Sequence, residues 1–270
     1  MRAACRILLT AVAVLLAVRA RSDEILISAA ASLTDSFSEI GRAYTAANPH
    51  TIVRFNFAAS GPLQQQILQG APVDVFASAS PKEMDALQRA NRIVAGTRVD
   101  FAANRLVLIA PAGSRLRSWN DLRSPAVRRV AVSNPDSVPA GRHARETLIR
   151  RELWSAVQPK AVFGENVRQT LAYVSGGNAD AGIVFATDSR IEARRVRIVA
   201  TDDPGGDHTP IVYPAAVVSG APNAAGARSF VHFLQGREAK SILARYGFAQ
   251  PASSLRADRR APKPRPRPAS

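Results

Sequence analysis

Short apolar runs of strand character alternate with helical patterns along this chain, and this order is what most constrains its fold. Residues 25–30 (ILISAA), 51–60 (TIVRFNFAAS) and 181–186 (AGIVFA) are strand-like, and each is followed by a segment with helical spacing. Two parallel strands need a crossover that is long enough to hold a helix, so this repeated order is typical of mainly parallel sheets. The sequence therefore predicts an α/β fold.

Two strand-like segments break the order, because neither is followed at once by a helix. They are residues 104–111 (NRLVLIAP) and 211–218 (IVYPAAVV), and they enclose a middle block with its own strand and helix pattern. Two such crossings predict two lobes with a cleft between them and the crossing strands as the hinge. We expect one lobe to comprise residues 22–103 and 217–250, and the other residues 107–213.

Both ends of the chain lie outside this pattern. Residues 1–20 combine a basic start, the apolar run ILLTAVAVLLAV and small residues up to Ala20, which is typical of a secretory signal peptide cleaved after Ala20. The alternative is an uncleaved membrane anchor, although the run is short for a span of about 20 residues. Residues 252–270 alternate proline with Lys and Arg, so we expect a disordered basic tail.

Cysteine content and charge argue against several classes of function. The only cysteine, Cys5, lies in the leader, so the exported chain has no thiol for a disulfide, a metal or a nucleophile. The formal net charge is +15, but the leader and the tail carry more than half of it. The remaining body shows no alternation of aromatic and basic residues of the kind that stacks bases, and we expect no nucleic-acid partner.

Four junctions between a strand and the following helix carry the candidate binding residues. In open α/β sheets, ligands bind beyond the carboxyl ends of strands, where the N-termini of helices gather. Free N–H groups and the positive end of the helix dipole favour an anion there. Two junctions come from each expected lobe, and they are marked by Ser32, by Ser60, by a helix that starts near Ala140, and by Asn166 as a cap before Val167.

Plainer roles for these and other residues stay open. Serine is a favoured N-cap, and Ser32 followed by Asp35 resembles a capping box with Asp in place of Glu. Arg142 and Arg168 flank two junctions and could steer anions, although arginines on helix surfaces are more often solvated. Residues 201–208 collect three aspartates and a histidine, but their Pro-Gly-Gly centre indicates an exposed turn rather than a cation site.

The segments around the junctions carry a family resemblance. They read AAASLTDSFSEIGRAYTAANP, FNFAASGPLQQQILQGAPVDVFASAS, NPDSVPAGRHARETL and ENVRQTLAYVSGGNADAGIVF. In this order, over nearly all of residues 23–250, the chain resembles the periplasmic molybdate-binding proteins of ABC transporters, the ModA type. The resemblance implies a two-lobed type II periplasmic-binding-protein fold, each lobe a mainly parallel sheet flanked by helices. It further implies a periplasmic monomer without a cofactor that delivers molybdate or tungstate to a membrane permease and its ATPase.

Carried over residue by residue, the resemblance also implies the oxyanion contacts. Ser32 and Ser60 would contribute their hydroxyl and amide groups, and Ala140 and Val167 their amides. These groups would hold molybdenum, as molybdate, through its oxygens. The fifth family contact is a tyrosine in a segment like GIVYG, whereas this chain has GIVFA, so that place is Phe185. A donor lost opposite a buried charged oxygen costs roughly 1–3 kcal/mol if nothing replaces it. A water or a hydroxyl such as that of Thr187 could substitute.

Three other functions remain as alternatives. One is a receptor of the same fold for sulfate or a small organic anion, another is a secreted hydrolase that uses Ser32 or Ser60, and the third is nucleic-acid binding through the tail. The sequence holds no G-x-S-x-G, S-x-x-K, P-loop or G-x-G-x-x-G after a strand. No histidine stands at a motif position where it could serve such a serine as a base, and the four histidines show no metal-ligand spacing. We therefore expect a binding protein and not an enzyme.

Overall fold

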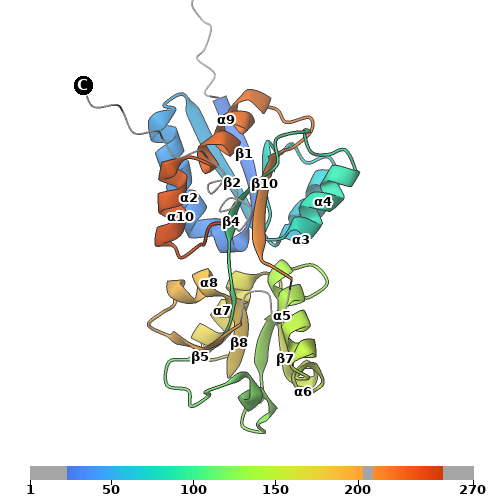
Figure 1. The fold of residues 1–270 in the computed structure, drawn as a ribbon, viewed down its shortest axis with the longest axis vertical. Coiled ribbons are helices and arrows are strands. Elements are labelled where there is room, and N and C mark those ends of the chain that lie inside the picture. The colour runs from blue at the N-terminus through green and yellow to red at the C-terminus, as the bar shows by residue number, and fades with distance from the viewer. Residues whose placement is uncertain (1–22, 203–208, 252–270) are drawn as a thin grey trace, which may run out of the picture.

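The computed structural model describes residues 23–202 and 209–251, which form two lobes stacked along the long axis of the molecule (Figure 1). The expected signal peptide and basic tail lie outside the described residues, as do residues 203–208 of the expected turn. Within the described ranges, no helix is long and apolar enough to cross a membrane.

Lobe I is built on a five-stranded sheet with the order β2-β1-β3-β10-β4. Strand β1 runs parallel to β2 and β3, whereas β10 runs antiparallel to β3 and β4. The strands are β1 (Asp23–Ala30), β2 (Thr51–Ala58), β3 (Val75–Ala77), β4 (Val99–Ala103) and β10 (Val212–Val217). The helices of this lobe are η1 (Ala31–Leu33), α2 (Thr34–Ala47), α3 (Ser60–Leu68), α4 (Pro81–Arg89), α9 (Ala224–Leu234) and α10 (Arg237–Arg245).

Lobe II repeats this plan with the strand order β7-β6-β8-β5-β9. Its strands are β5 (Leu106–Pro111), β6 (Val130–Ser133), β7 (Ala161–Gly164), β8 (Ala181–Phe185) and β9 (Val196–Thr201). Its helices are η2 (Trp119–Arg123), α5 (Pro139–Arg150), α6 (Trp154–Val157), η3 (Gln158–Lys160), α7 (Val167–Ser175) and α8 (Ala186–Ile191).

The predicted α/β fold with two lobes is confirmed, and both sheets are mixed. Among the strands that the structure describes, every antiparallel pairing involves β5 or β10, and an isolated antiparallel bridge also joins Ala103 of β4 to Ala249. Strands β5 and β10 enter their sheets from the other lobe rather than from a crossover helix, so they are free to run against their neighbours. Strand β10 lies wholly in the sheet of lobe I, where Val212 and Tyr213 pair with Ala103 and Ala102. These two residues had been expected at the end of lobe II, and the exact limits of the lobes remain a prediction.

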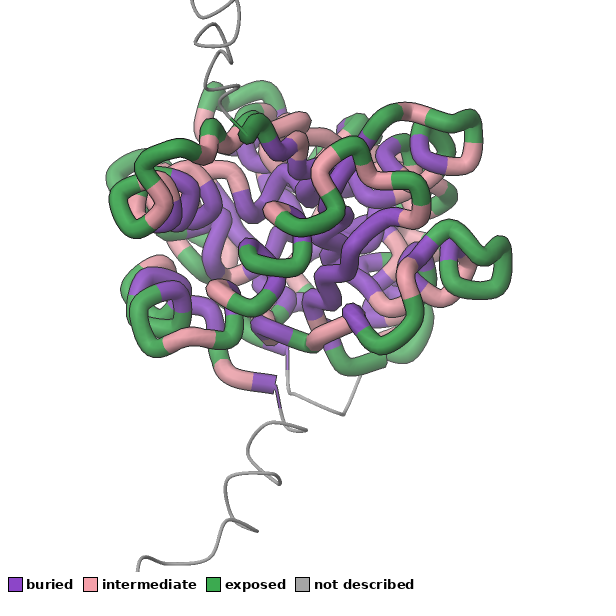
Figure 2. Tube along the Cα trace, turned by 90° about the horizontal axis from the view of Figure 1, so that it is seen from above, coloured by how far each residue is buried: buried purple, intermediate pink, exposed green. Residues whose placement is uncertain are grey.

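Buried apolar side chains fill each lobe under a shell of exposed loops and helix faces (Figure 2). Helix α2 turns Phe37, Ile40 and Tyr44 inward at helical spacing. The ring of Phe37 lies 5.5 Å from that of Phe101 and 6.2 Å from that of Phe230, which ties the first part of lobe I to its last helices. Full burial of each such side chain contributes about 1.5–3 kcal/mol, so the packing anchors the helix starts that face lobe II.

Candidate functional site

The four predicted junctions converge on one small cavity between the lobes. All five residues predicted for the site line this cavity: Ser32, Ser60, Ala140, Val167 and Phe185. They come from η1, α3, α5, α7 and the end of β8. Strand ends and helix starts from both sheets therefore face the same point.

Ser32 reaches the cavity from a short 3-10 turn. The turn η1 separates β1 from α2, so Leu33 is the N-cap of α2, and no side chain caps this helix. The capping box of Ser32 with Asp35 is therefore wrong, because the turn places Ser32 before the helix start. Instead, Ser32 Oγ lies 3.0 Å from the hydroxyl oxygen of Tyr213 on β10.

Ser60 is the first residue of α3 rather than its cap. The N-cap is Ala59, and no side chain caps this helix either. The buried hydroxyl oxygen of Ser60 accepts a hydrogen bond of 3.0 Å from the backbone N–H of Ala79. For both serines the plain capping role is wrong, and the Ser60 hydroxyl keeps its own hydrogen for another partner.

In lobe II the site is built from backbone at two helix starts. Helix α5 begins at Pro139, a residue well suited to the first helical position, and Ala140 follows. Helix α7 begins at Val167, and the Asn166 side chain accepts hydrogen bonds of 3.0 Å from the backbone N–H groups of Arg168 and Gln169. The predicted cap and helix start at Asn166 and Val167 are confirmed.

Phe185 ends β8 and presents a buried ring to the cavity. The Thr187 hydroxyl, which could have replaced the missing phenol, is not part of the described cavity lining and lies 2.9 Å from the side-chain nitrogen of Asn104. The phenol nearest the serines belongs to Tyr213, whose ring packs edge-on against Phe185 with the centroids 6.0 Å apart. Sequence reasoning missed Tyr213, although a lone hydroxyl in the crossing strand IVYPAAVV was a usable signal.

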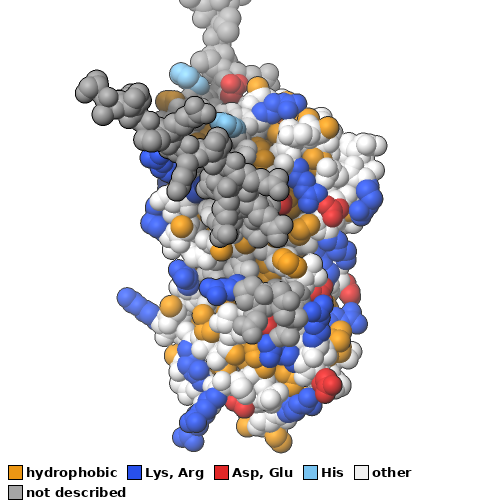
Figure 3. All heavy atoms as spheres, viewed as in Figure 1, with side chains coloured by type: hydrophobic (Ala, Val, Ile, Leu, Met, Phe, Trp, Pro, Cys, Tyr) orange, Lys and Arg blue, Asp and Glu red, His pale blue; other side chains and the backbone are white. Residues whose placement is uncertain are grey.

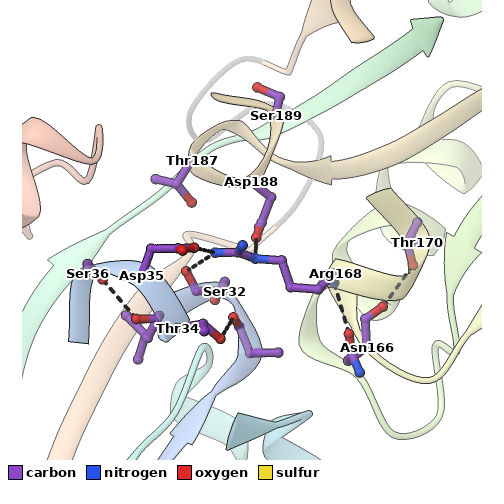
Figure 4. Close-up of polar contacts among 12 residues, drawn as sticks. Ser32, Thr34, Asp35, Ser36, Asn166, Arg168, Thr170, Thr187, Asp188 and Ser189 are labelled. Carbon is purple, nitrogen blue, oxygen red and sulfur yellow. Dashed lines mark hydrogen bonds and ion pairs between the residues drawn. The ribbon is translucent and has the colours of Figure 1, made fainter. Parts of the chain in front are cut away.

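The arginines beside the junctions connect the lobes. Arg168 on α7 forms ion pairs of 2.6 Å with Asp35 of lobe I and with the fully buried Asp188 of lobe II (Figure 4). Arg142 on α5 lies 2.8 Å from Glu83 of lobe I. The side chains of Arg142 and Arg168 are only 15% and 23% exposed. The prediction that they are solvated is wrong, because carboxylates across the cleft bury and neutralise them.

Burial dominates the titration of Asp188. It raises the pKa of this carboxyl to about 6, while the neighbouring Arg168 guanidinium acts in the opposite direction. The carboxylate is therefore ionised at neutral pH and keeps its ion pair with Arg168 there.

A backbone contact also joins the lobes beside the cavity. The N–H of Gly61 donates a hydrogen bond of 3.2 Å to the carbonyl oxygen of Ser137 in lobe II. A Cβ atom on residue 61 would lie only 2.3 Å from that oxygen. Only glycine allows this approach, so the contact depends on the absence of a side chain.

The chemistry of the cavity suits an anion that carries no hydrogen of its own. No Lys or Arg lines the cavity in the part of the chain that the structure describes. The available groups are serine hydroxyls and the backbone of helix starts, which favour negative charge. On the face shown in Figure 3, Lys and Arg are scattered over both lobes rather than gathered into one patch.

Cation binding finds no support in residues 23–202 and 209–251. No group of three or more His, Cys, Asp or Glu in these ranges could hold a metal ion. Asp202, the first aspartate of the expected turn, is buried and bonds to Thr147 at 2.7 Å and Arg151 at 3.0 Å. Its carboxylate serves the packing of α5.

Comparison with known proteins finds relatives over most of the chain. The model of the family "Bacterial extracellular solute-binding protein" matches residues 25–249. The chain is 37% identical to the molybdate-binding protein ModA of Haemophilus influenzae over 85% of this chain and 91% of that protein. It is 36% identical to ModA of Escherichia coli over 85% and 90% of the two chains. The solved periplasmic molybdate-binding protein of Azotobacter vinelandii superposes with a TM-score of 0.75 at 26% identity, covering 84% of this chain and 99% of the other.

Proposed function

Because the chain belongs to the family of bacterial extracellular solute-binding proteins, we propose that it captures molybdate or tungstate between its lobes and delivers it to an ABC transporter. The observation that carries this proposal is the meeting of two serines and two helix starts in one cavity without a charged side chain. Members of the family bind solutes and are not enzymes, so the hydrolase alternative is dropped.

In the proposed complex, the hydroxyls of Ser32 and Ser60 and the backbone N–H groups of Ala140 and Val167 donate to the oxyanion. Phe185 closes the cavity with an apolar ring and donates nothing. Molybdenum is held only through its oxygens, and no cofactor is needed. A site that consists of donors suits a dianion that stays deprotonated at neutral pH.

The size of the cavity is the proposed basis of selectivity. Helix starts that are fixed by the packing of both lobes leave only a small space between them. Molybdate and tungstate are nearly equal in size and larger than sulfate. We expect the cavity to bind the first two alike and to leave sulfate with longer, weaker hydrogen bonds.

A second candidate is a receptor of the same fold for sulfate or a small organic anion. The observation in its favour is Phe185, which offers an apolar edge where a phenol would have donated. Such an edge tolerates a small organic anion with fewer oxygens or an apolar part, whereas it gives no advantage to sulfate, which has four oxygens as molybdate does.

The proposed setting is the periplasm, where the protein acts as a monomer. Its partners there are the membrane permease and the ATPase subunit of the transporter. The solved molybdate-binding protein of Azotobacter vinelandii is periplasmic, and a solved relative from Clostridium difficile is the "substrate binding domain of putative molybdenum ABC transporter", which supports the location and the transporter.

Isothermal titration of residues 21–270 with molybdate, tungstate and sulfate tests the proposal. We expect tight binding of the first two and at least 100-fold weaker binding of sulfate. Comparable binding of sulfate would contradict selection by size. No heat with any of the three would refute the oxyanion function and favour an organic anion.

A further inference from the structure

Four polar side chains form a chain from the hinge to the cavity. The side-chain nitrogen of Asn104 lies 2.9 Å from Thr187 Oγ1 and 3.2 Å from the hydroxyl oxygen of Tyr213, which in turn lies 3.0 Å from Ser32 Oγ. Asn104 lies between β4 and β5, and Tyr213 lies on β10. Both crossings between the lobes thus contribute a residue to the chain.

The backbone sets the direction in which Asn104 points. The N–H of Arg105 lies 2.9 Å from Asn104 Oδ1. A backbone N–H can only donate, so this oxygen is the acceptor, and the NH2 group must face Thr187 and Tyr213. In the reverse orientation the NH2 group of Asn104 would face the N–H of Arg105, and two donors would lie opposite each other.

The orientation of Asn104 fixes the direction of the hydrogen bonds that the Tyr213 hydroxyl forms. Because the NH2 group of Asn104 can only donate, the phenol oxygen accepts from it. The phenol has one hydrogen, and its other partner is Ser32 Oγ. Complete burial raises the pKa of the Tyr213 phenol above its usual range, so this hydrogen stays in place at neutral pH.

Ser32 Oγ is then the acceptor at the end of the chain, and its own hydrogen is free to point into the cavity that Ser32 lines. We propose that Asn104 and Tyr213 are positioning residues that hold the Ser32 hydroxyl as a donor to the bound oxyanion. This inference rests on the proposed function. Neither residue touches the oxyanion, since both act through Ser32.

Ser60 reaches the same state by a shorter route. Its oxygen accepts from the backbone N–H of Ala79, which fixes its role as an acceptor outside the cavity. Ser60 also keeps its hydrogen for the cavity that it lines. Two different devices, a backbone amide and a chain of side chains, prepare the two serines as donors. The consequence is a preference for ligands whose oxygens only accept.

A double-mutant cycle tests whether Tyr213 acts through Ser32. Molybdate affinity is measured by calorimetry for wild type, Tyr213→Phe, Ser32→Ala and the double variant, after thermal melts show that each is folded. We expect Tyr213→Phe to weaken binding about 3- to 10-fold, as for loss of one oriented hydrogen bond. In the Ser32→Ala background the same change should have no further effect. If the losses of molybdate affinity caused by the two single substitutions multiply in the double variant, the inference is overturned.

Reversal of the chain is a sharper test. In Asn104→Asp the carboxylate accepts the Tyr213 hydrogen, so Ser32 must donate to Tyr213 and is lost to the oxyanion. We expect weaker binding than in Tyr213→Phe. The same substitution in Ser32→Ala measures the repulsion by the new charge alone, and equal losses in both backgrounds would contradict reversal. Thr187→Val is the matched control, with less than about a 2-fold effect, because Arg105 still orients Asn104.

A measurement without any anion separates this inference from the proposed function. Neutron diffraction from a deuterated, ligand-free crystal locates the deuterium on the Tyr213 hydroxyl. A position toward Ser32 Oγ is expected even if the wild-type chain binds none of the tested oxyanions. A position toward Asn104 would overturn the inference even if molybdate binds tightly.

Discussion

The two lobes contribute to the cavity in different ways. Lobe I offers side-chain hydroxyls, those of Ser32 and Ser60, and each of them already forms a hydrogen bond within the lobe or its hinge. Lobe II offers helix starts at Ala140 and Val167 and the ring of Phe185. Donors in lobe I can therefore be removed by substitution, whereas those in lobe II depend on where a helix begins.

The lobes also differ in how they use charge. The arginines that join them, Arg142 and Arg168, come from lobe II. Their ion-pair partners in lobe I are Glu83 and Asp35. Asp188 adds a buried charge that lobe II must neutralise by itself. The charged side chains that join the lobes thus lie beside the cavity and do not line it. Four predictions test these differences between the lobes.

Removal of Arg168 should have the largest effect. Arg168→Met leaves the fully buried Asp188 without its ion-pair partner, and we expect unfolding to become about 3–5 kcal/mol easier. Urea unfolding at pH 7.5 measures this loss. The comparison is Asp35→Asn, which removes the half-exposed partner in lobe I and should cost less than about 1 kcal/mol. Equal losses would mean that the bridge between the lobes, and not the buried charge, governs stability.

The pH dependence of the unfolding free energy should reflect the protonation of Asp188. Its pKa is about 6 in the fold against an ordinary 3.8, so the folded protein binds the extra proton more readily. The resulting stabilisation is complete below about pH 4 and is lost as the pH rises through 6, with a full size of about 3 kcal/mol. Arg168, Asp35 and Tyr213 are the groups that sense this charge.

Asp188→Asn is the reference for this measurement, because it cannot titrate. Unfolding free energies of both proteins are compared between pH 4 and 7. The wild type should gain relative to the variant as the pH falls. A difference that stays constant would contradict a raised pKa at Asp188.

A methyl group at residue 61 should weaken the closure of the two lobes without changing the groups that donate to the anion. In Gly61→Ala the new Cβ meets the Ser137 carbonyl only when the lobes are together. An overpacked contact costs about 1–3 kcal/mol, so molybdate affinity should fall about 10- to 100-fold. Thermal stability without ligand should be unchanged or higher, since alanine favours the helix.

Gly113→Ala is the matched control for this prediction. A Cβ there would meet nothing within 4 Å. Its molybdate affinity should equal that of the wild type. If Gly61→Ala also binds normally, the contact with Ser137 does not limit closure.

Loss of the cap on α7 should have the smallest effect. Asn166→Ala removes the acceptor for two backbone N–H groups, and we expect a loss of about 1 kcal/mol in unfolding free energy. Asn166→Ser keeps a capping oxygen and should restore most of it. If neither variant changes stability, packing alone fixes the start of the helix.

Local signals predicted the four junctions at Ser32, Ser60, Ala140 and Val167, whereas Phe185 was named only because of the family resemblance. Asn166 stands directly before Val167, and its short side chain bonds to the next backbone groups, so sequence sufficed there. Ser32 was harder, because a turn of three residues shifts the start of α2 beyond it. The pattern of polar and apolar residues is the same with or without such a turn.

Contacts between distant residues account for what sequence could not predict. Tyr213 meets Ser32 across 181 positions, and Arg168 meets Asp35 across the cleft. Both carboxylate partners of Arg168, Asp35 and Asp188, are distant from it in the sequence, so a solvated arginine was the natural expectation. Only the folding of both lobes brings these partners together.

The position of β10 has a consequence for the order in which the chain is completed during synthesis. This strand lies between β3 and β4, so the sheet of lobe I stays split in two until residues 212–217 have been made. The sheet of lobe II is encoded without interruption in residues 106–201. The lobe in the middle of the sequence is thus the first that can complete its sheet, before the strand that joins the two parts of the other sheet has been made.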